Sequence, residues 1–201
     1  ILSPVGNLFF EGESKDAVDK DAFRFNIAFR EIAHGLGVKE TVSGKGSVDA
    51  ALGNHALTWE EAKANVVGNY LVCKLLERHD VDALITKENA MATFVASLLR
   101  AQRFGEAEAL GRGNIMILNY LVKNGAISRN ASGKYALDYA KIQDSIRDLA
   151  GIILKTQAEG DLEFAEKFEA EYGALPSNFE EDKTLMNLEG IPVDVRFDFK
   201  K

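Results

Sequence analysis

Apolar residues recur at intervals of three and four positions along most of the chain, with polar residues between them. This spacing places the apolar side chains on one face of an α-helix, so that each helix has a face toward a core and a face toward water. We predict two shorter helices on either side of Pro176, and longer helices over 19–36, 58–76, 81–103, 106–123 and 139–158. The pattern therefore predicts a mainly α-helical fold.

Two segments carry signals for β-strands instead. In 127–137, Asn130 and Gly133 lie between two short runs of β-prone residues, which is typical of a small hairpin. In 191–199, apolar and polar residues alternate, and Pro192 restricts such a strand to the edge of a sheet. We therefore expect a minor β component, consisting of a hairpin and a C-terminal edge strand.

The length of 201 residues accommodates one domain, or one large lobe of a larger protein. We divide this domain into an irregular N-terminal segment at 1–13, a helical core at 14–158, and acidic helices with the terminal strand at 159–201. The acidic run within 159–182 is expected to form a solvated helical face. Ile1 is not an initiator residue, and no signal-peptide pattern follows it, so we expect a processed or truncated chain.

Composition and charge exclude several classes of protein. The chain is 46% hydrophobic and 27% charged, which is the range of globular proteins and not of disordered or collagen-like ones. A formal net charge of −7 argues against a nucleic-acid partner, which normally requires a basic face. No apolar run approaches the roughly 20 residues that span a bilayer, so we expect no transmembrane segment. The single Cys73 excludes an intrachain disulfide and a Cys-based zinc site, and it fits a reducing compartment such as the cytosol or an organelle interior.

Candidate chemistry lies in the segment from Arg30 to Gly37. A helical zinc-peptidase site needs two histidines one turn apart and a glutamate after the first, which accepts a proton from the metal-bound water. Glu31 and His34 supply the glutamate and the second histidine, but Arg30 stands at the position of the first. Arg30 and His34 still share one helical face, so the geometry is kept while one ligand is chemically unsuited to a metal.

A second candidate segment lies at the start of the next predicted helix. Thr58 and Glu61 have the spacing of a capping box, in which Thr58 is the N-cap residue. A second helix that presents a glutamate also completes the three-ligand pattern of one large group of zinc peptidases. Glu61 can serve a metal only if its carboxylate does not reach back to Thr58. His55, which precedes Glu61 in the entering loop, is a further candidate ligand.

Several separated motifs, which follow one another in order, resemble those of the dipeptidyl peptidase III group of zinc peptidases. They are Glu31-Ile-Ala-His-Gly-Leu-Gly37, Glu60-Glu-Ala-Lys-Ala64 with Gly68 and Tyr70, Arg103-Phe-Gly105, Gly111-Arg-Gly-Asn114 with Asn119-Tyr120, Gly125-Ala126, Thr156-Gln157, Gly160-Asp161 and Gly190-Ile-Pro-Val-Asp-Val195. The chain is most similar to the shorter bacterial-type members, which in plants occur fused to Nudix domains. The resemblance implies a zincin-like peptidase of two lobes around a wide cleft, in which this chain forms the helical, zinc-bearing lobe.

The resemblance also implies roles for individual residues. His34 corresponds to a zinc ligand, Glu31 to the general base, and Glu61 to the third ligand. Three positions depart from the family pattern.

Arg30 replaces the first zinc histidine, Leu110 replaces a histidine near the reacting centre, and Asn65 replaces an acid that orients a ligand imidazole. Two protein ligands are fewer than the three typical of catalytic zinc, and an arginine cannot lose its proton to bind a metal. We therefore expect a degenerate site without metal in the helical core, where Arg30 occupies the metal position and pairs with Glu61 or Glu31.

These departures favour a catalytically inactive, peptidase-like domain, a pseudoenzyme with a structural or interaction role in a larger assembly. We expect other protein subunits as its partners and no cofactor. The alternative is an active zinc-dependent hydrolase of the dipeptidyl-peptidase type, with Glu31 as base and His34, Glu61 and His55 as ligands. A third interpretation is a module that binds short peptides without cleaving them. Metal content distinguishes the first two, and peptide binding without turnover identifies the third.

Overall fold

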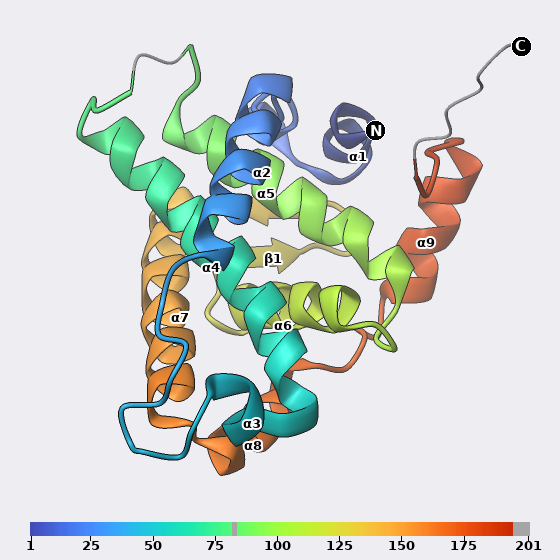
Figure 1. Ribbon diagram of the computed structural model, residues 1–201. Coiled ribbons are helices and arrows are strands. Elements are labelled where there is room, and N and C mark those ends of the chain that lie inside the picture. Colours follow the sequence, from blue (N-terminus) through green and yellow to red (C-terminus); the bar gives the residue numbers. More distant parts are fainter. Residues whose placement is uncertain (82–83, 195–201) are drawn as a thin grey trace, which may run out of the picture.

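The computed structural model describes residues 1–81 and 84–194, whose arrangement Figure 1 shows. Its helices are α1 (Leu2–Phe9), α2 (Lys20–His34), α3 (Val48–Leu52), α4 (Ala56–Glu77), α5 (Lys87–Ala101), α6 (Ala109–Lys123), α7 (Tyr139–Glu159), α8 (Leu162–Tyr172) and α9 (Phe179–Leu188). The remaining elements are the strands β1 (Ile127–Arg129) and β2 (Tyr135–Leu137) and the 3-10 turns η1 (Gly12–Lys15), η2 (Gly53–His55) and η3 (Gln102–Phe104). The fold is mainly α-helical with a small hairpin, as the sequence predicts. None of the described helices is long and apolar enough to cross a membrane.

α4 lies at the centre of the molecule and packs against α2, α5, α6 and α7 (Figure 1). Its buried side chains point in most directions around the helix and include Trp59, Ala62, Val66 and Cys73. A helix that is covered on most sides has little contrast between its faces, unlike the amphipathic helices around it. α4 is therefore the element against which the other helices are positioned.

Two glycines allow neighbouring helices to approach α4 closely. A Cβ atom on Gly68 of α4 would lie 2.8 Å from the backbone nitrogen of Arg30 in α2, which is closer than real Cβ contacts. A Cβ atom on Gly113 of α6 would lie 3.2 Å from the backbone nitrogen of Ala62 in α4. Gly68 thus places the backbone of α2 directly against α4 at Arg30.

Buried amide groups link α2, α4 and α5. Asn26 Nδ2 donates to the carbonyl oxygen of Ala90 at 3.0 Å, and Asn69 Nδ2 donates to Asn26 Oδ1 at 3.1 Å. Both asparagines are buried, where an unsatisfied amide group costs about 1–3 kcal/mol. The network therefore favours one relative placement of these three helices.

The N-terminal segment differs from the irregular structure predicted for 1–13. α1 forms there, and its Val5 and Phe9 are fully buried in the core that includes α5. Pro4 and Gly6 weaken the local helix signal, but Pro4 lies in the first turn, where no intrahelical hydrogen bond is lost. Burial of the apolar side chains thus outweighs the weak local propensity.

The predicted capping box at Thr58 is wrong, because Thr58 lies inside α4. The chain enters α4 from η2, and His55 already has helical backbone angles, so no side-chain cap forms there. A capping box forms instead at α5, where Thr86 Oγ1 accepts from the backbone nitrogen of Asn89 and Asn89 Oδ1 accepts from that of Thr86. This cap starts α5 at Lys87, later than the predicted start at 81.

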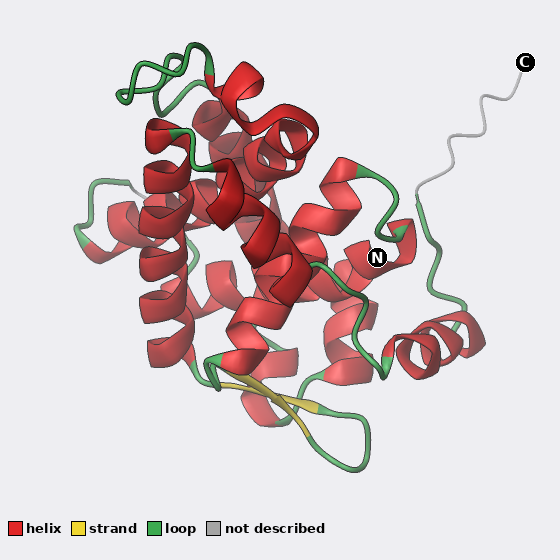
Figure 2. Ribbon diagram, turned by 90° about the horizontal axis from the view of Figure 1, so that it is seen from below, coloured by secondary structure: helices red, strands yellow, loops and turns green. Residues whose placement is uncertain are grey.

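The hairpin is confirmed, with Ile127 opposite Leu137 in an antiparallel pair. Figure 2 shows it in yellow at one edge of the helical body. The side chain of Asn130 accepts hydrogen bonds from two backbone nitrogens of the turn, and Gly133 has the positive φ that the turn requires. The two residues that signalled the hairpin therefore build its turn.

The predicted C-terminal edge strand does not form in its described part, 191–194, which is a loop. Arg100 and Arg103 donate to backbone carbonyl oxygens of this loop, so side chains take the place of a neighbouring strand. The remainder of the predicted strand, 195–199, lies outside the described residues.

Candidate functional site

Arg30 connects α2 to α4 through its guanidinium group. Nη2 lies 2.5 Å from Glu61 Oε2, and Nη1 lies 2.5 Å from Glu31 Oε1. The side chains of Arg30 and Glu61 are each 18% exposed, so their contact is shielded from water on most sides. Arg30 thus pairs with both glutamates, and the Glu61 carboxylate accepts from Arg30 instead of reaching back to Thr58.

His34 forms a second link between the same helices. Its Nδ1 lies 3.1 Å from Glu60 Oε1, while Glu60 Oε2 lies 2.9 Å from Lys63 Nζ. Burial alone would raise the pKa of the Glu60 carboxyl group, but hydrogen bonds from Lys63 and His34 outweigh it and hold the pKa below its ordinary value. Glu60 is therefore held as a carboxylate that orients the imidazole.

The Lys63 side chain on α4 is almost completely buried, which is unusual for a lysine. Its ammonium group donates to the carbonyl oxygen of Leu36 at 2.7 Å and approaches that of His34 at 3.4 Å. Carbonyl groups at the end of a helix lack intrahelical partners and carry partial negative charge, so a cation is stabilised there. Lys63 thus binds the C-terminal end of α2 to α4.

Arg30, Asn65 and Leu110, the three positions at which the resemblance implies other residues, line one cleft between α2, α4, α5 and the start of α6. The cleft has a volume of about 240 Å³. Asn65 Nδ2 donates to Asn114 Oδ1 at 3.1 Å, and Asn114 also faces the cleft. Its remaining walls are mainly apolar and are formed by residues such as Phe23, Ile27, Phe94, Leu98 and Phe104.

His55 lies in a different place from the other candidate ligands. Its Nδ1 is 2.8 Å from Glu169 Oε1 on α8, although the two atoms are not aligned as a hydrogen bond. Trp59 Nε1 donates to the same Glu169 oxygen at 3.1 Å. His55 therefore lies in the contact between η2 and α8, on a different element from His34 and Glu61.

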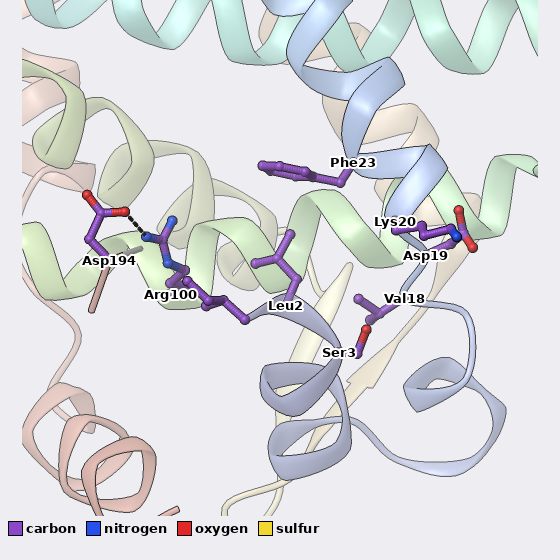
Figure 3. A pocket seen from close by; sticks show the side chains of 9 residues that line it. Leu2, Ser3, Val18, Asp19, Lys20, Phe23, Arg100 and Asp194 are labelled. Carbon is purple, nitrogen blue, oxygen red and sulfur yellow. Dashed lines mark hydrogen bonds and ion pairs between the residues drawn. The ribbon is translucent and has the colours of Figure 1, made fainter. Parts of the chain in front are cut away.

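A second hollow of about 320 Å³ adjoins the cleft, because Phe23 and Arg100 line both. Figure 3 shows Phe23 on one side of this hollow and Arg100 beside Asp194. Arg100 Nη2 and Asp194 Oδ1 form an ion pair of 3.1 Å. The two hollows therefore follow each other along α2, with an arginine at their junction.

Sequence reasoning missed Glu60, Lys63 and Asn114. A lysine is ordinarily a surface residue, so its residue type gives no reason to expect burial of Lys63. The one signal in the sequence is its i,i+3 spacing from Glu60, with which it forms an ion pair. Asn114 belongs to a motif of the resemblance, but its contact with Asn65 depends on the crossing of α4 and α6.

Comparison with known proteins finds a relative and solved structures that match nearly the whole chain. No protein-family model matches the chain. Nudix hydrolase 3 of Arabidopsis thaliana is 30% identical over 204 residues, which cover 97% of this chain and 26% of that protein. The solved structure of DPP III from Caldithrix abyssi matches with a TM-score of 0.89 and 30% identity, over 97% of this chain and 37% of that one. Dipeptidyl-peptidase III from Corallococcus sp. strain EGB matches with a TM-score of 0.87 and 32% identity, over 98% of this chain and 36% of that one.

The chain has a dipeptidyl peptidase III-like fold. This finding agrees with the fold class predicted from the sequence, a mainly helical lobe with a small hairpin. The chain spans 26% of the length of the curated relative and 36–37% of the two solved chains.

The residues of this dipeptidyl peptidase III-like fold do not fit the zinc ion that the resemblance implies. No group of three or more His, Cys, Asp or Glu side chains is arranged to hold a metal within the described part of the chain. His34 and Glu61 remain, but a permanently charged guanidinium group already binds Glu61. A catalytic zinc site normally has three protein ligands, whereas His34 and Glu61 are only two.

Proposed function

We propose that this chain is a peptidase-like domain that does not hydrolyse peptides and that serves a structural or protein-interaction role with other protein subunits. The observation that carries the proposal is the Arg30 guanidinium group, which binds both Glu31 and Glu61. The resemblance assigns Glu31 the part of general base. Here its carboxylate accepts from Arg30, so the group that would accept a proton is held by a cation.

Two further changes support the loss of hydrolysis. Peptide hydrolysis needs hydrogen-bond donors or charge at the oxygen that becomes negative in the transition state. The resemblance places a histidine at position 110, where the side chain of Leu110 can donate no hydrogen bond. Asn65, where the resemblance places an acid that orients a ligand imidazole, bonds instead with Asn114.

An interaction role is supported by apolar side chains that α2 presents at the surface. Phe23 is 38% exposed, Ile27 is 42% exposed and Ile32 is 52% exposed. Single exposed apolar residues are common, but Phe23 and Ile27 adjoin an apolar cleft, and clustered apolar surface is typical of sites that contact other molecules.

Hydrolysis of dipeptidyl naphthylamides, with and without added zinc, tests the catalytic part of the proposal. We expect no release of naphthylamine above that of a protein-free control. Zinc-dependent turnover that is lost in Glu31→Gln would instead establish the alternative, an active zinc hydrolase with Glu31 as base.

Native purification from the source cells tests the interaction part. We expect a stoichiometric partner that is lost in Ile27→Glu and retained in the matched control Leu188→Glu, which changes an exposed leucine on α9. A chain that purifies alone, or a partner that both variants retain, would contradict a role for this face of α2.

A second candidate function, binding of short peptides without cleavage, is favoured by the amide pair in the cleft. Asn65 Oδ1 and Asn114 Nδ2 have no hydrogen-bond partner among the described residues, and they offer an acceptor and a donor that match a peptide group. Fluorescence polarisation with labelled tetrapeptides measures such binding. We expect the native chain to bind the peptide and leave it intact by mass spectrometry, and we expect Asn114→Leu to bind it more weakly. Equal affinity of the native chain and Asn114→Leu would refute peptide binding at this amide pair.

A further inference from the structure

Arg100, in the last turn of α5, lines both the cleft and the adjoining hollow, so its side chain lies where the two meet. Nη2 donates to the carbonyl oxygen of Val193 at 2.6 Å and to Asp194 Oδ1 at 3.1 Å. Nε is buried and has no hydrogen-bond partner among the described residues. A buried N–H group without an acceptor is unfavourable, so Arg100 gains from binding a further oxygen atom.

The charge on the walls of the cleft is positive, although the chain as a whole has a formal net charge of −7. Among the described residues that line the cleft, the charged ones are Arg30 and Arg100. Asp19 and Asp194, by contrast, line the adjoining hollow. Arg30 already pairs with two carboxylates. An anion at Arg100 is therefore favoured on the side of the cleft.

Asp194 shows that a carboxylate can reach this arginine. Its Oδ1 contacts Nη2, while Nε is left without an acceptor. The Asp194 side chain is 74% exposed, and ion pairs that reach into water contribute little to stability. A carboxylate can bind a guanidinium group more strongly through two parallel N–H···O bonds. A ligand carboxylate that reaches both Nε and Nη2 would therefore displace this ion pair.

The walls of the cleft around Arg100 suit an apolar group. Leu98 and Leu110 line the cleft, and Phe104 packs against the arginine, whose Cζ atom lies 5.3 Å from the centre of the ring. Phe23 extends the apolar wall into the adjoining hollow, where Figure 3 shows it. Sites for small molecules typically combine mostly apolar walls with a few placed polar groups. The cleft, at about 240 Å³, has this character on a small scale.

We propose that the cleft binds an apolar carboxylic acid, whose carboxylate pairs with Arg100 and whose apolar group lies between the walls of the cleft. Two sources share this chemistry, a free fatty acid of medium length and the C-terminal residue of an apolar peptide. The inference goes beyond the proposed function, because neither the loss of hydrolysis nor a protein partner requires a ligand here. It also differs from binding of a peptide group by Asn65 and Asn114, since the negative charge of the ligand is decisive.

Isothermal titration calorimetry of the full chain with matched probes tests the ligand class. The probes are octanoate with octanamide, N-acetyl-leucyl-phenylalanine with its C-terminal amide, and acetate. We expect at least one of the two apolar acids to bind with one molecule per chain. Its amide, which lacks the charge, and acetate, which lacks the apolar group, should bind at least about tenfold more weakly. The acid that binds more tightly identifies the source of the carboxylate.

Three variants test the place of binding. Arg100→Met should weaken binding of the acid at least about tenfold. Asp194→Ala removes the competing carboxylate and should strengthen binding about two- to fivefold. Arg103→Met is the matched control, because Arg103 donates to the same loop at the carbonyl oxygen of Ile191 but is not among the described residues that line the cleft. Its affinity should equal that of the native chain.

Equal affinity for an acid and its amide would overturn the inference, as would the absence of binding by both acids. Equal affinities of Arg100→Met and Arg103→Met, with both folded by circular dichroism, would overturn the place of binding. If Arg100→Met does not fold, Asp194→Ala decides, and weaker binding in that variant counts against the inference. Peptide binding that depends on Asn114 but not on a free carboxylate would support the amide pair and refute the role of Arg100.

Discussion

The Arg30 guanidinium group forms ion pairs with two carboxylates that differ in exposure. The Glu61 side chain is 18% exposed, whereas that of Glu31 is 62% exposed. Ion pairs in water contribute little to stability, whereas a shielded carboxylate that loses its partner is costly. A planar group with several N–H donors can serve both carboxylates, which the ammonium group of a lysine does less well. We therefore expect most of the contribution of Arg30 to stability to come from Glu61.

Replacement of Arg30 with methionine removes the charge and keeps a long side chain. We expect the free energy of unfolding to fall by about 1–3 kcal/mol, because Glu61 is left shielded and without a partner. Urea unfolding followed by circular dichroism measures the loss, and a second change, Glu61→Gln, should recover part of it. Arg24→Met, at a side chain that is 74% exposed, should change stability by less than about 0.5 kcal/mol. Equal losses in the two single variants would contradict the role of Arg30.

Glu60 should make the stability of the chain depend on pH in the acid range. Its pKa lies below the ordinary value of 4.5 in the folded chain, so the unfolded chain takes up the proton first as the pH falls. By linkage, the stabilisation is complete above the unfolded pKa and is lost as the pH falls through the lower, folded pKa. The difference in Tm between the native chain and Glu60→Gln should therefore stay constant above the ordinary pKa of 4.5 and shrink as the pH falls below it.

Glu163→Gln is the control for this pH series, because its side chain is 79% exposed. The Tm of Glu163→Gln should stay close to that of the native chain at every pH. If the difference in Tm between the native chain and Glu60→Gln does not change with pH, Glu60 stabilises by contacts that do not depend on its charge.

Among the secondary-structure elements, amphipathic helices were the most predictable. The segment predicted over 139–158 is α7, Tyr139–Glu159, because its apolar residues alone define one face against the core. α1 was missed because Pro4 and Gly6 interrupt the local pattern, while burial of Val5 and Phe9 stabilises the helix. Element type could thus be predicted where the local pattern and the packing agree.

Gly68→Ala tests how closely α2 and α4 must pack. A methyl group there would meet the backbone of Arg30 at 2.8 Å, and a backbone cannot turn aside as a flexible side chain can. We expect a loss of about 1–3 kcal/mol in the free energy of unfolding from overpacking. Gly151→Ala on α7, where a Cβ atom would meet nothing within 4 Å, is the matched control. It should stabilise the chain by up to about 1 kcal/mol through helix propensity; a similar gain in Gly68→Ala would show that the two helices can separate freely.

Over the whole molecule, Asp182 joins segments that are far apart in the sequence. This carboxylate on α9 is buried and accepts from Tyr135 Oη on β2 at 2.6 Å. It also accepts from Arg129 Nη2 on β1 at 3.0 Å. Burial raises the pKa of the Tyr135 hydroxyl group, and its hydrogen bond to Asp182 adds to this effect, so the tyrosine remains a donor. The solvated face predicted for 159–182 thus ends in a buried acid that attaches α9 to the hairpin.

Asp182→Ala should lower the free energy of unfolding by about 2–4 kcal/mol, because Arg129 and Tyr135 lose their buried partner together. Urea unfolding measures the loss, and hydrogen exchange should show faster opening of α9 than of α4. Glu181 also pairs with Arg129, but its side chain is 61% exposed. Glu181→Ala should therefore change the free energy of unfolding by less than about 0.5 kcal/mol. Equal effects of the two variants would refute the attachment of α9 through Asp182.

Periodicity and residue type are local properties, so the mainly helical class, the hairpin and the chemical character of Arg30, Asn65 and Leu110 could be predicted from the sequence. Which side chains meet depends on the tertiary structure. It brought those three residues to one cleft, directed His55 to α8 and buried Lys63 at the end of α2. The physical reason is that such contacts depend on where helices cross, and the crossings are determined by glycines and buried side chains that leave no periodic signal in the sequence.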